Sequence, residues 1–89
     1  MKTAVIIKVS GRVQGVGFRF YTQRKAIENN VFGFVQNKPD GSVYIEAEGE
    51  ATDVQTFVDW CRKGPQWASV RDIQVSETLP LNRIDFVIR

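Results

Sequence analysis

The 89-residue sequence contains no histidine and a single cysteine, Cys61. An internal disulfide is therefore impossible, and a zinc site of the Cys/His type lacks the ligands it needs. Nucleophilic catalysis by a Ser–His or Cys–His pair is excluded for the same reason, because both pairs use histidine as the base. Any catalytic chemistry must rely on main-chain amides, arginine or lysine, carboxylates and amide side chains.

Long hydrophobic runs are also missing. The longest strictly apolar run is Ala4–Ile7, far short of the about 20 residues that a membrane-spanning helix needs. Lys2 followed by this run loosely resembles a secretion signal, but Lys8 interrupts it early and no A-x-A-like cleavage site follows. We therefore expect no association with a membrane and a cytoplasmic location.

What is present is the composition of an ordinary globular domain. Apolar residues make up 43% and charged residues 25% of the chain, which argues against disorder. A chain of this length is expected to form one domain over residues 1–89 and to bury a core without disulfide or metal. The net charge of +2 slightly favours a small anionic ligand and is weak support for nucleic acid binding. We expect a monomer that binds no nucleic acid.

The pattern of apolar residues predicts a mixed order of strands and helices. Alternation predicts strands at about residues 5–9, 31–37, 43–48, 73–75 and 84–88, and longer uninterrupted segments predict helices at about 19–30 and 52–63. Lys38-Pro39-Asp40-Gly41 predicts a tight turn between the second and third strands. This order predicts a ferredoxin-like α+β sandwich (βαββαβ), with two helices on one face of an antiparallel sheet and a short extra C-terminal strand.

In the first predicted helix, Phe20, Arg24 and Ile27 share one face, with Ala26 beside it, and form a thin stripe that is expected to be buried. Asn30 is expected to take a left-handed conformation at the end of this helix. Phe18 and Phe20 are expected to be core residues that anchor the preceding loop.

The second predicted helix begins at a capping box formed by Thr52 and Gln55. Its apolar residues have the i, i+3, i+4, i+7 spacing of an amphipathic helix and are Val54, Phe57, Val58 and Cys61. Gly64-Pro65 is expected to end the helix. Cys61 lies on the apolar stripe, so we expect an inert buried thiol.

A glycine-rich segment, Ser10–Phe18, joins the first strand to the first helix. A helix N-terminus has free N–H groups and a partial positive charge, and glycine lets such amides approach an oxyanion closely. The segment could therefore bind phosphate or sulfate. Arg19 follows it, where a cation opposes the helix dipole, and bidentate binding of phosphate would explain that placement. The Walker A and dinucleotide-binding motifs do not fit, so a plain connection with glycines at sharp turns remains an alternative at this point.

Three motifs together cover almost the whole chain and resemble those of the acylphosphatase family. Gly11-Arg12-Val13-Gln14-Gly15-Val16-Gly17-Phe18-Arg19 resembles the family signature G-[KR]-V-Q-G-V-x-F-R. The segments Gly33–Asn37 and Asp40–Val43 resemble a second element, and Phe86–Arg89 resembles the closing one. The sequence departs from many relatives at Lys38, where they have threonine.

The resemblance implies an enzyme that hydrolyses acyl phosphates, which are carboxyl–phosphate mixed anhydrides, to a carboxylate and inorganic phosphate, without a metal, a cofactor or a covalent intermediate. It implies that Arg19 binds the phosphoryl oxygens and that Asn37 orients the attacking water. The phosphate-binding residues it implies are Gln14, Gly15, Val16, Gly17, Phe18 and Arg19. A carboxamide has no basic pKa, which agrees with positioning of water rather than proton abstraction by Asn37.

Two other classes of protein compete with this interpretation. Phe32-Gly33-Phe34-Val35 resembles the core of the RNP1 motif of RNA-recognition domains, which have the same topology. In those domains the motif lies on the third strand, whereas here it lies on the second. A small-anion sensor would use the same loop without turnover, and Asn37 distinguishes it from an enzyme, because only catalysis needs a positioned water.

Overall fold

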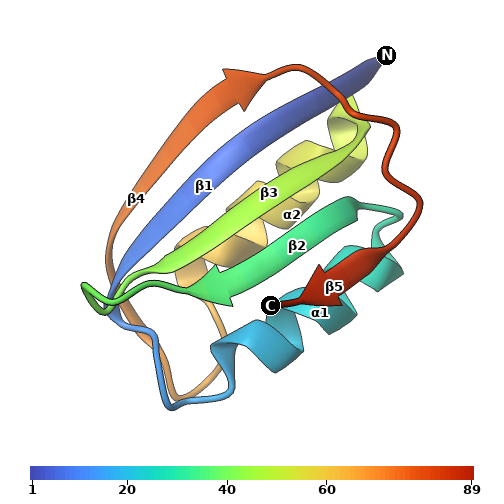
Figure 1. Ribbon diagram of the computed structural model, residues 1–89. Coiled ribbons are helices and arrows are strands. Elements are labelled where there is room, and N and C mark those ends of the chain that lie inside the picture. Colours follow the sequence, from blue (N-terminus) through green and yellow to red (C-terminus); the bar gives the residue numbers. More distant parts are fainter.

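Two helices pack on one face of a five-stranded sheet (Figure 1). The computed structural model describes residues 1–89. The elements are β1 (Lys2–Arg12), α1 (Phe18–Glu28), β2 (Phe32–Asn37), β3 (Val43–Glu50), α2 (Ala51–Lys63), β4 (Ser69–Thr78) and β5 (Phe86–Ile88). The sheet order is β4-β1-β3-β2-β5, and all neighbours are antiparallel except β2 and β5, which are parallel. The predicted ferredoxin-like α+β sandwich is confirmed, with a sheet that is mixed rather than purely antiparallel.

The two last strands differ in extent from their predicted ranges. β4 continues on both sides of residues 73–75, because it pairs with β1 along almost its whole length although most of its side chains are exposed. β5 begins only at Phe86, and Ile84 lies before it with 88% of its surface exposed. Main-chain pairing at a sheet edge therefore extends beyond what apolar alternation indicates.

The core lies between the helices and the inner face of the sheet. It contains Ile7 and Val9 of β1, alternating residues of β3 and the apolar stripe of α2. The predicted stripe is confirmed: Val54, Phe57, Val58 and Cys61 are all buried. Burial raises the pKa of the Cys61 thiol, so this thiol stays protonated and unreactive at neutral pH.

The predicted capping box of α2 is wrong. The helix begins at Ala51 with Glu50 as its N-cap, and no side chain caps it. Thr52 already lies in the first turn, and its carbonyl accepts a hydrogen bond from the Thr56 hydroxyl at 3.1 Å. Gln55 instead donates to the carboxylate of Asp59 at 2.9 Å. Because β3 runs directly into α2 without a loop, the helix starts before the residues that resemble a cap.

The predicted buried face of α1 is also wrong. Phe20 is 50% exposed and Ile27 63% exposed, whereas the buried residues are Phe18, Thr22 and Ala26. The Thr22 hydroxyl is satisfied within the helix, because it donates to the carbonyl of Phe18 at 2.7 Å. Residues spaced by four lie on one helix face, and small side chains at two of these positions suit close packing on the sheet. The expectation that Phe20 anchors the loop from the core therefore fails, while that for Phe18 is confirmed.

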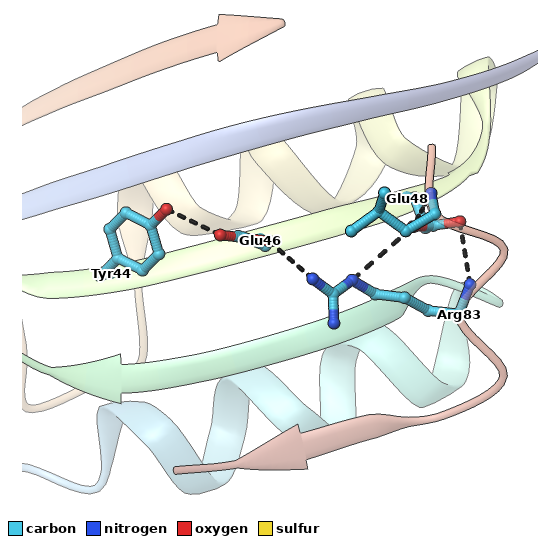
Figure 2. Close-up of polar contacts among 5 residues, drawn as sticks. Tyr44, Glu46, Glu48 and Arg83 are labelled. Carbon is cyan, nitrogen blue, oxygen red and sulfur yellow. Dashed lines mark hydrogen bonds and ion pairs between the residues drawn. The ribbon is translucent and has the colours of Figure 1, made fainter. Parts of the chain in front are cut away.

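The opposite face of the sheet carries a network that fastens the segment between β4 and β5. Figure 2 shows the Arg83 guanidinium between Glu46, at 2.7 Å, and Glu48, at 3.7 Å. The buried Glu48 carboxylate also accepts hydrogen bonds from the main-chain N–H groups of Leu81, at 2.9 Å, and Arg83, at 3.2 Å. The Tyr44 hydroxyl donates to Glu46 at 2.8 Å. These contacts hold residues 79–85 over the sheet, so that the chain reaches the edge of β2 and forms β5.

Two residues predicted to have a positive φ angle do have one, whereas Asn82, with φ 58°, was not predicted. Asn30, which follows α1, has φ 56°, and Gly41 in the turn between β2 and β3 has φ 92°. No helix of this structure has the length and apolar character required to cross a membrane.

Candidate active site

The loop between β1 and α1 is shaped by two glycines with left-handed backbone. Gly15 has φ 74° and Gly17 has φ 80°. Both values lie in the left-handed region of backbone conformation, which residues with a Cβ adopt only with strain. Gly17 is the N-cap of α1, and no side chain caps the helix. The two glycines therefore bend the chain between β1 and α1, which both a phosphate-binding loop and a plain connection would require.

The main-chain N–H groups of residues 14–19 donate no hydrogen bond within the protein. The first donor of the helix is Tyr21, which bonds to the carbonyl of Gly17 at 3.1 Å. The first turn of α1 contains no acidic residue that could neutralise the positive end of the helix dipole. Free N–H groups at a helix N-terminus form a binding site for an oxyanion.

The side chain of Gln14 ties this loop to the turn between β2 and β3. Its Nε2 donates to the carbonyl of Lys38 at 2.9 Å and to that of Ser42 at 2.8 Å. Both protons of the amide are used in this way, so the side chain is a structural link and the main-chain N–H is the only donor of Gln14 left for a ligand. The link brings the turn that follows Asn37 next to the loop.

The turn itself is held by Asp40. Its carboxylate accepts hydrogen bonds from the hydroxyl of Ser42 at 2.6 Å and from the Ser42 main-chain N–H at 2.9 Å, and the Lys8 ammonium lies 3.2 Å away. The two Ser42 hydrogen bonds, followed by Lys8, lower the pKa of Asp40 to about 2. The carboxylate therefore stays ionised at neutral and mildly acidic pH, and the turn keeps its shape over that range.

Asn37, the last residue of β2, carries an unusual polar group. Its Oδ1 is buried and has no hydrogen-bond partner in the protein. Leaving a buried acceptor unpaired costs about 1–3 kcal/mol, and most buried polar groups in folded proteins are paired. Since neither amide atom of Asn37 is used by the fold, the side chain is available for a ligand or for water.

Arg19 reaches across to the C-terminal segment. Its Nη1 donates to the main-chain oxygen of Arg89 at 3.0 Å. The bond uses one donor of the guanidinium and orients the group, leaving further N–H donors free, because a guanidinium has five in total. Figure 1 shows the N-terminal end of α1, the turn after β2 and the C-terminal end of the chain at the same side of the molecule.

These groups meet in one cavity of about 220 Å³. It is lined by Val13, Gln14, Gly15, Gly17, Phe18, Arg19, Phe20, Asn37 and Ile88. The structure thus brings the two predicted catalytic residues together with most of the predicted loop. Val16 is the exception, because its side chain packs against the core cluster instead of lining the cavity.

Sequence reasoning did not place Phe20, Ile88 or the oxygen of Arg89 at this cavity. Ile88 and Arg89 belong to the closing motif Phe86–Arg89, whose resemblance to the family was the available signal. Phe20 gave no such signal, because its apolar side chain is typical of a core position. The only ionisable side chain in the lining is Arg19, so the cavity holds a positive charge and no general base.

The structure defines a small α+β domain with a cavity that brings together free main-chain amides, one guanidinium and one amide side chain. The sequence matches the family model described as Acylphosphatase over residues 5–88. A relative named Acylphosphatase from Oceanobacillus iheyensis is 50% identical over 72 residues, which are 80% of this chain and 79% of that protein.

Solved structures agree with this match. An acylphosphatase from Coxiella burnetii has a TM-score of 0.95 at 34% identity, covering 99% of this chain and 93% of that one. An acylphosphatase from Bacillus subtilis has a TM-score of 0.92 at 40% identity, covering 100% and 99%. The chain belongs to the acylphosphatase family and is a hydrolase that acts on acyl phosphates.

Proposed function

We propose that the free main-chain amides of residues 14–19 and the guanidinium of Arg19 bind the phosphoryl group of the substrate, and that Asn37 positions the attacking water. The observation that carries the proposal is the meeting of these unpaired groups in one cavity. A phosphoryl group has three peripheral oxygens, whose charge fixed N–H donors and one cation stabilise without reorganisation.

The reaction needs little from the protein beyond position and charge. The water oxygen attacks phosphorus, the bond between phosphorus and the carboxylate oxygen breaks, and its electron pair leaves with the carboxylate. A carboxylate is a good leaving group, so no strong general acid is required. The cavity lining offers no base, so the proton of the water passes to an oxygen of the phosphoryl group. Catalysis of this kind depends mainly on positioning and electrostatic stabilisation.

Asn37 supplies the position of the water. In the observed conformation Oδ1 is shielded from solvent and unpaired, and the side chain of Asn37 belongs to a residue that lines the cavity. Nδ2 can donate to the water oxygen, and a half-turn of the amide would let Oδ1 accept a proton of the water instead. Either contact fixes the nucleophile without changing its basicity.

The remaining features of the proposal follow from the same cavity. All of its lining residues come from one chain, so a monomer over residues 1–89 suffices for activity. Phosphate or sulfate would bind to the loop in place of the substrate. The proposed reaction involves neither nucleic acid nor a membrane. The cytoplasm is the proposed location.

Hydrolysis of benzoyl phosphate by the purified protein, followed by loss of substrate absorbance and release of phosphate, tests this function. Inorganic phosphate should inhibit competitively, because it occupies the site of the phosphoryl group. An RNA-binding measurement serves as the control for the competing class and should give no binding. Absence of hydrolysis, or phosphate inhibition that is not competitive, would overturn the proposal.

A further inference from the structure

Two exposed apolar side chains border the polar cavity. Phe20 of α1 is 50% exposed and Ile88 of β5 is 41% exposed, and both line the cavity. The other apolar lining residues, Val13 and Phe18, are buried at 1% and 2% exposure. Phe20 and Ile88 are therefore the apolar side chains that a bound molecule would touch.

The fold does not use these two side chains in its core. The buried face of α1 contains Phe18, Thr22 and Ala26, which leaves Phe20 on the outside. Single exposed apolar residues are common on protein surfaces. What distinguishes this pair is that it comes from two elements distant in sequence and borders the same anion site.

The ring of Phe20 is held in place on the surface of α1. It makes an edge-to-face contact with Tyr21, with ring centroids 5.2 Å apart. The guanidinium carbon of Arg24 lies 5.7 Å from the centroid of the Phe20 ring. A ring fixed by neighbours loses little conformational freedom when a ligand covers it, so its apolar surface is available for binding at low entropic cost.

We infer that Phe20 and Ile88 form the acyl-binding surface of the enzyme and favour acyl phosphates with an aromatic or bulky apolar acyl group. The inference rests on the proposed function. If the main-chain amides of residues 14–19 and the Arg19 guanidinium bind the phosphoryl group, the acyl group projects out of the same cavity. The rim of this cavity is apolar at Phe20, the residue next to Arg19. An acetyl group is too small to cover much of this surface, whereas a phenyl ring covers it and removes apolar area from water.

The test compares benzoyl phosphate with acetyl phosphate in the wild-type protein and in Phe20→Ala and Ile88→Thr. One methylene in an enclosed apolar pocket changes kcat/KM by about tenfold or more, and a half-open surface contributes less. We expect each substitution to lower the ratio of kcat/KM for benzoyl over acetyl phosphate by about 3- to 10-fold. The intrinsic reactivities of the two substrates differ, but that difference cancels when the ratio is compared between variants.

Ile27→Ala is the matched control, because Ile27 is an exposed apolar residue of α1 outside the cavity; it should leave the ratio unchanged. Phe20→Leu should fall between wild type and Phe20→Ala, since it keeps part of the apolar surface. The inhibition constant for inorganic phosphate should stay within about twofold in every variant, because phosphate has no acyl group.

Equal loss of activity on both substrates, or an unchanged ratio in both variants, would overturn the acyl-binding surface. Failure of the proposed function gives a different result: the wild-type protein would hydrolyse neither substrate, or phosphate would not compete.

Discussion

Arg19 is the only charged side chain in the cavity lining, and one hydrogen bond to the oxygen of Arg89 fixes its direction. Removal of a single preorganised donor from an active site costs about 100- to 1000-fold in rate, and a charged donor costs more. Arg19→Ala should therefore lower kcat/KM for benzoyl phosphate by about 1000-fold or more, and it should weaken inhibition by phosphate, as steady-state kinetics will show.

The matched control for this variant is Arg62→Ala, which removes the same charge from an exposed position on α2. It should retain normal activity and phosphate inhibition. Retained turnover in Arg19→Ala, with unchanged phosphate affinity, would mean that Arg19 does not bind the substrate.

Asn37→Ala should affect turnover alone, because the proposed contact of Asn37 is with water and not with the anion. Asn37→Ala is expected to lower kcat by about 100-fold, the cost of losing the orientation of one reactant. The inhibition constant for phosphate should change by less than about twofold. Measuring both quantities on one preparation separates the two roles, and a parallel loss of phosphate affinity would show that Asn37 binds the anion instead.

At the scale of the element, Glu48 shows how a buried charge shapes the site from a distance. Its carboxylate side chain is 3% exposed and bonds two main-chain N–H groups of the segment that precedes β5. Glu48→Gln should lower the free energy of unfolding by about 2 kcal/mol, the size of a hydrogen bond to a charged group, as measured by urea denaturation.

Glu77→Gln on β4 is the comparison for this measurement, since Glu77 is exposed and forms no ion pair within 4.0 Å. Its effect should be within about 0.5 kcal/mol. Equal effects of the two substitutions would mean that the Glu48 network contributes nothing to stability.

The two helices show why the sequence predicted one element well and another poorly. The stripe of α2 consists of large apolar residues, so its buried face could be identified from spacing alone. On α1 the large apolar residues Phe20 and Ile27 are exposed, and the buried positions include Thr22 and Ala26. Hydrophobicity predicts which residues favour burial, but two of the three buried positions on α1 have small side chains, so the large apolar residues did not mark its buried face.

At the site, the sequence predicted the loop and its two polar partners through the family motifs. The links between them could not be predicted, because they join residues far apart in the chain. The Gln14 amide bonds to carbonyls of the β2–β3 turn, and Arg19 bonds to a main-chain oxygen of Arg89. Every residue type has a main-chain oxygen that can accept a hydrogen bond, so the sequence does not mark which of them do. These contacts are identified only in the folded structure.

At the scale of the whole molecule, the proposed mechanism takes the charge that catalysis needs from one guanidinium and from main-chain dipoles. No group of three or more His, Cys, Asp or Glu side chains is placed to hold a metal ion. We expect the kcat for benzoyl phosphate to be unaffected by prolonged treatment with EDTA, measured against an untreated sample. A loss of activity that added magnesium restores would contradict the proposed mechanism.

In the proposed mechanism the main-chain amides of residues 14–19 enclose the phosphoryl group together with Arg19. Titration of the ¹⁵N-labelled protein with inorganic phosphate, observed in ¹H–¹⁵N NMR spectra, measures this binding residue by residue. We expect the largest saturable shifts for the amides of residues 14–19 and for the Arg19 guanidinium. Shifts centred instead on the cavity between α1 and α2, near Arg24 and Lys25, with no response in the loop, would contradict it.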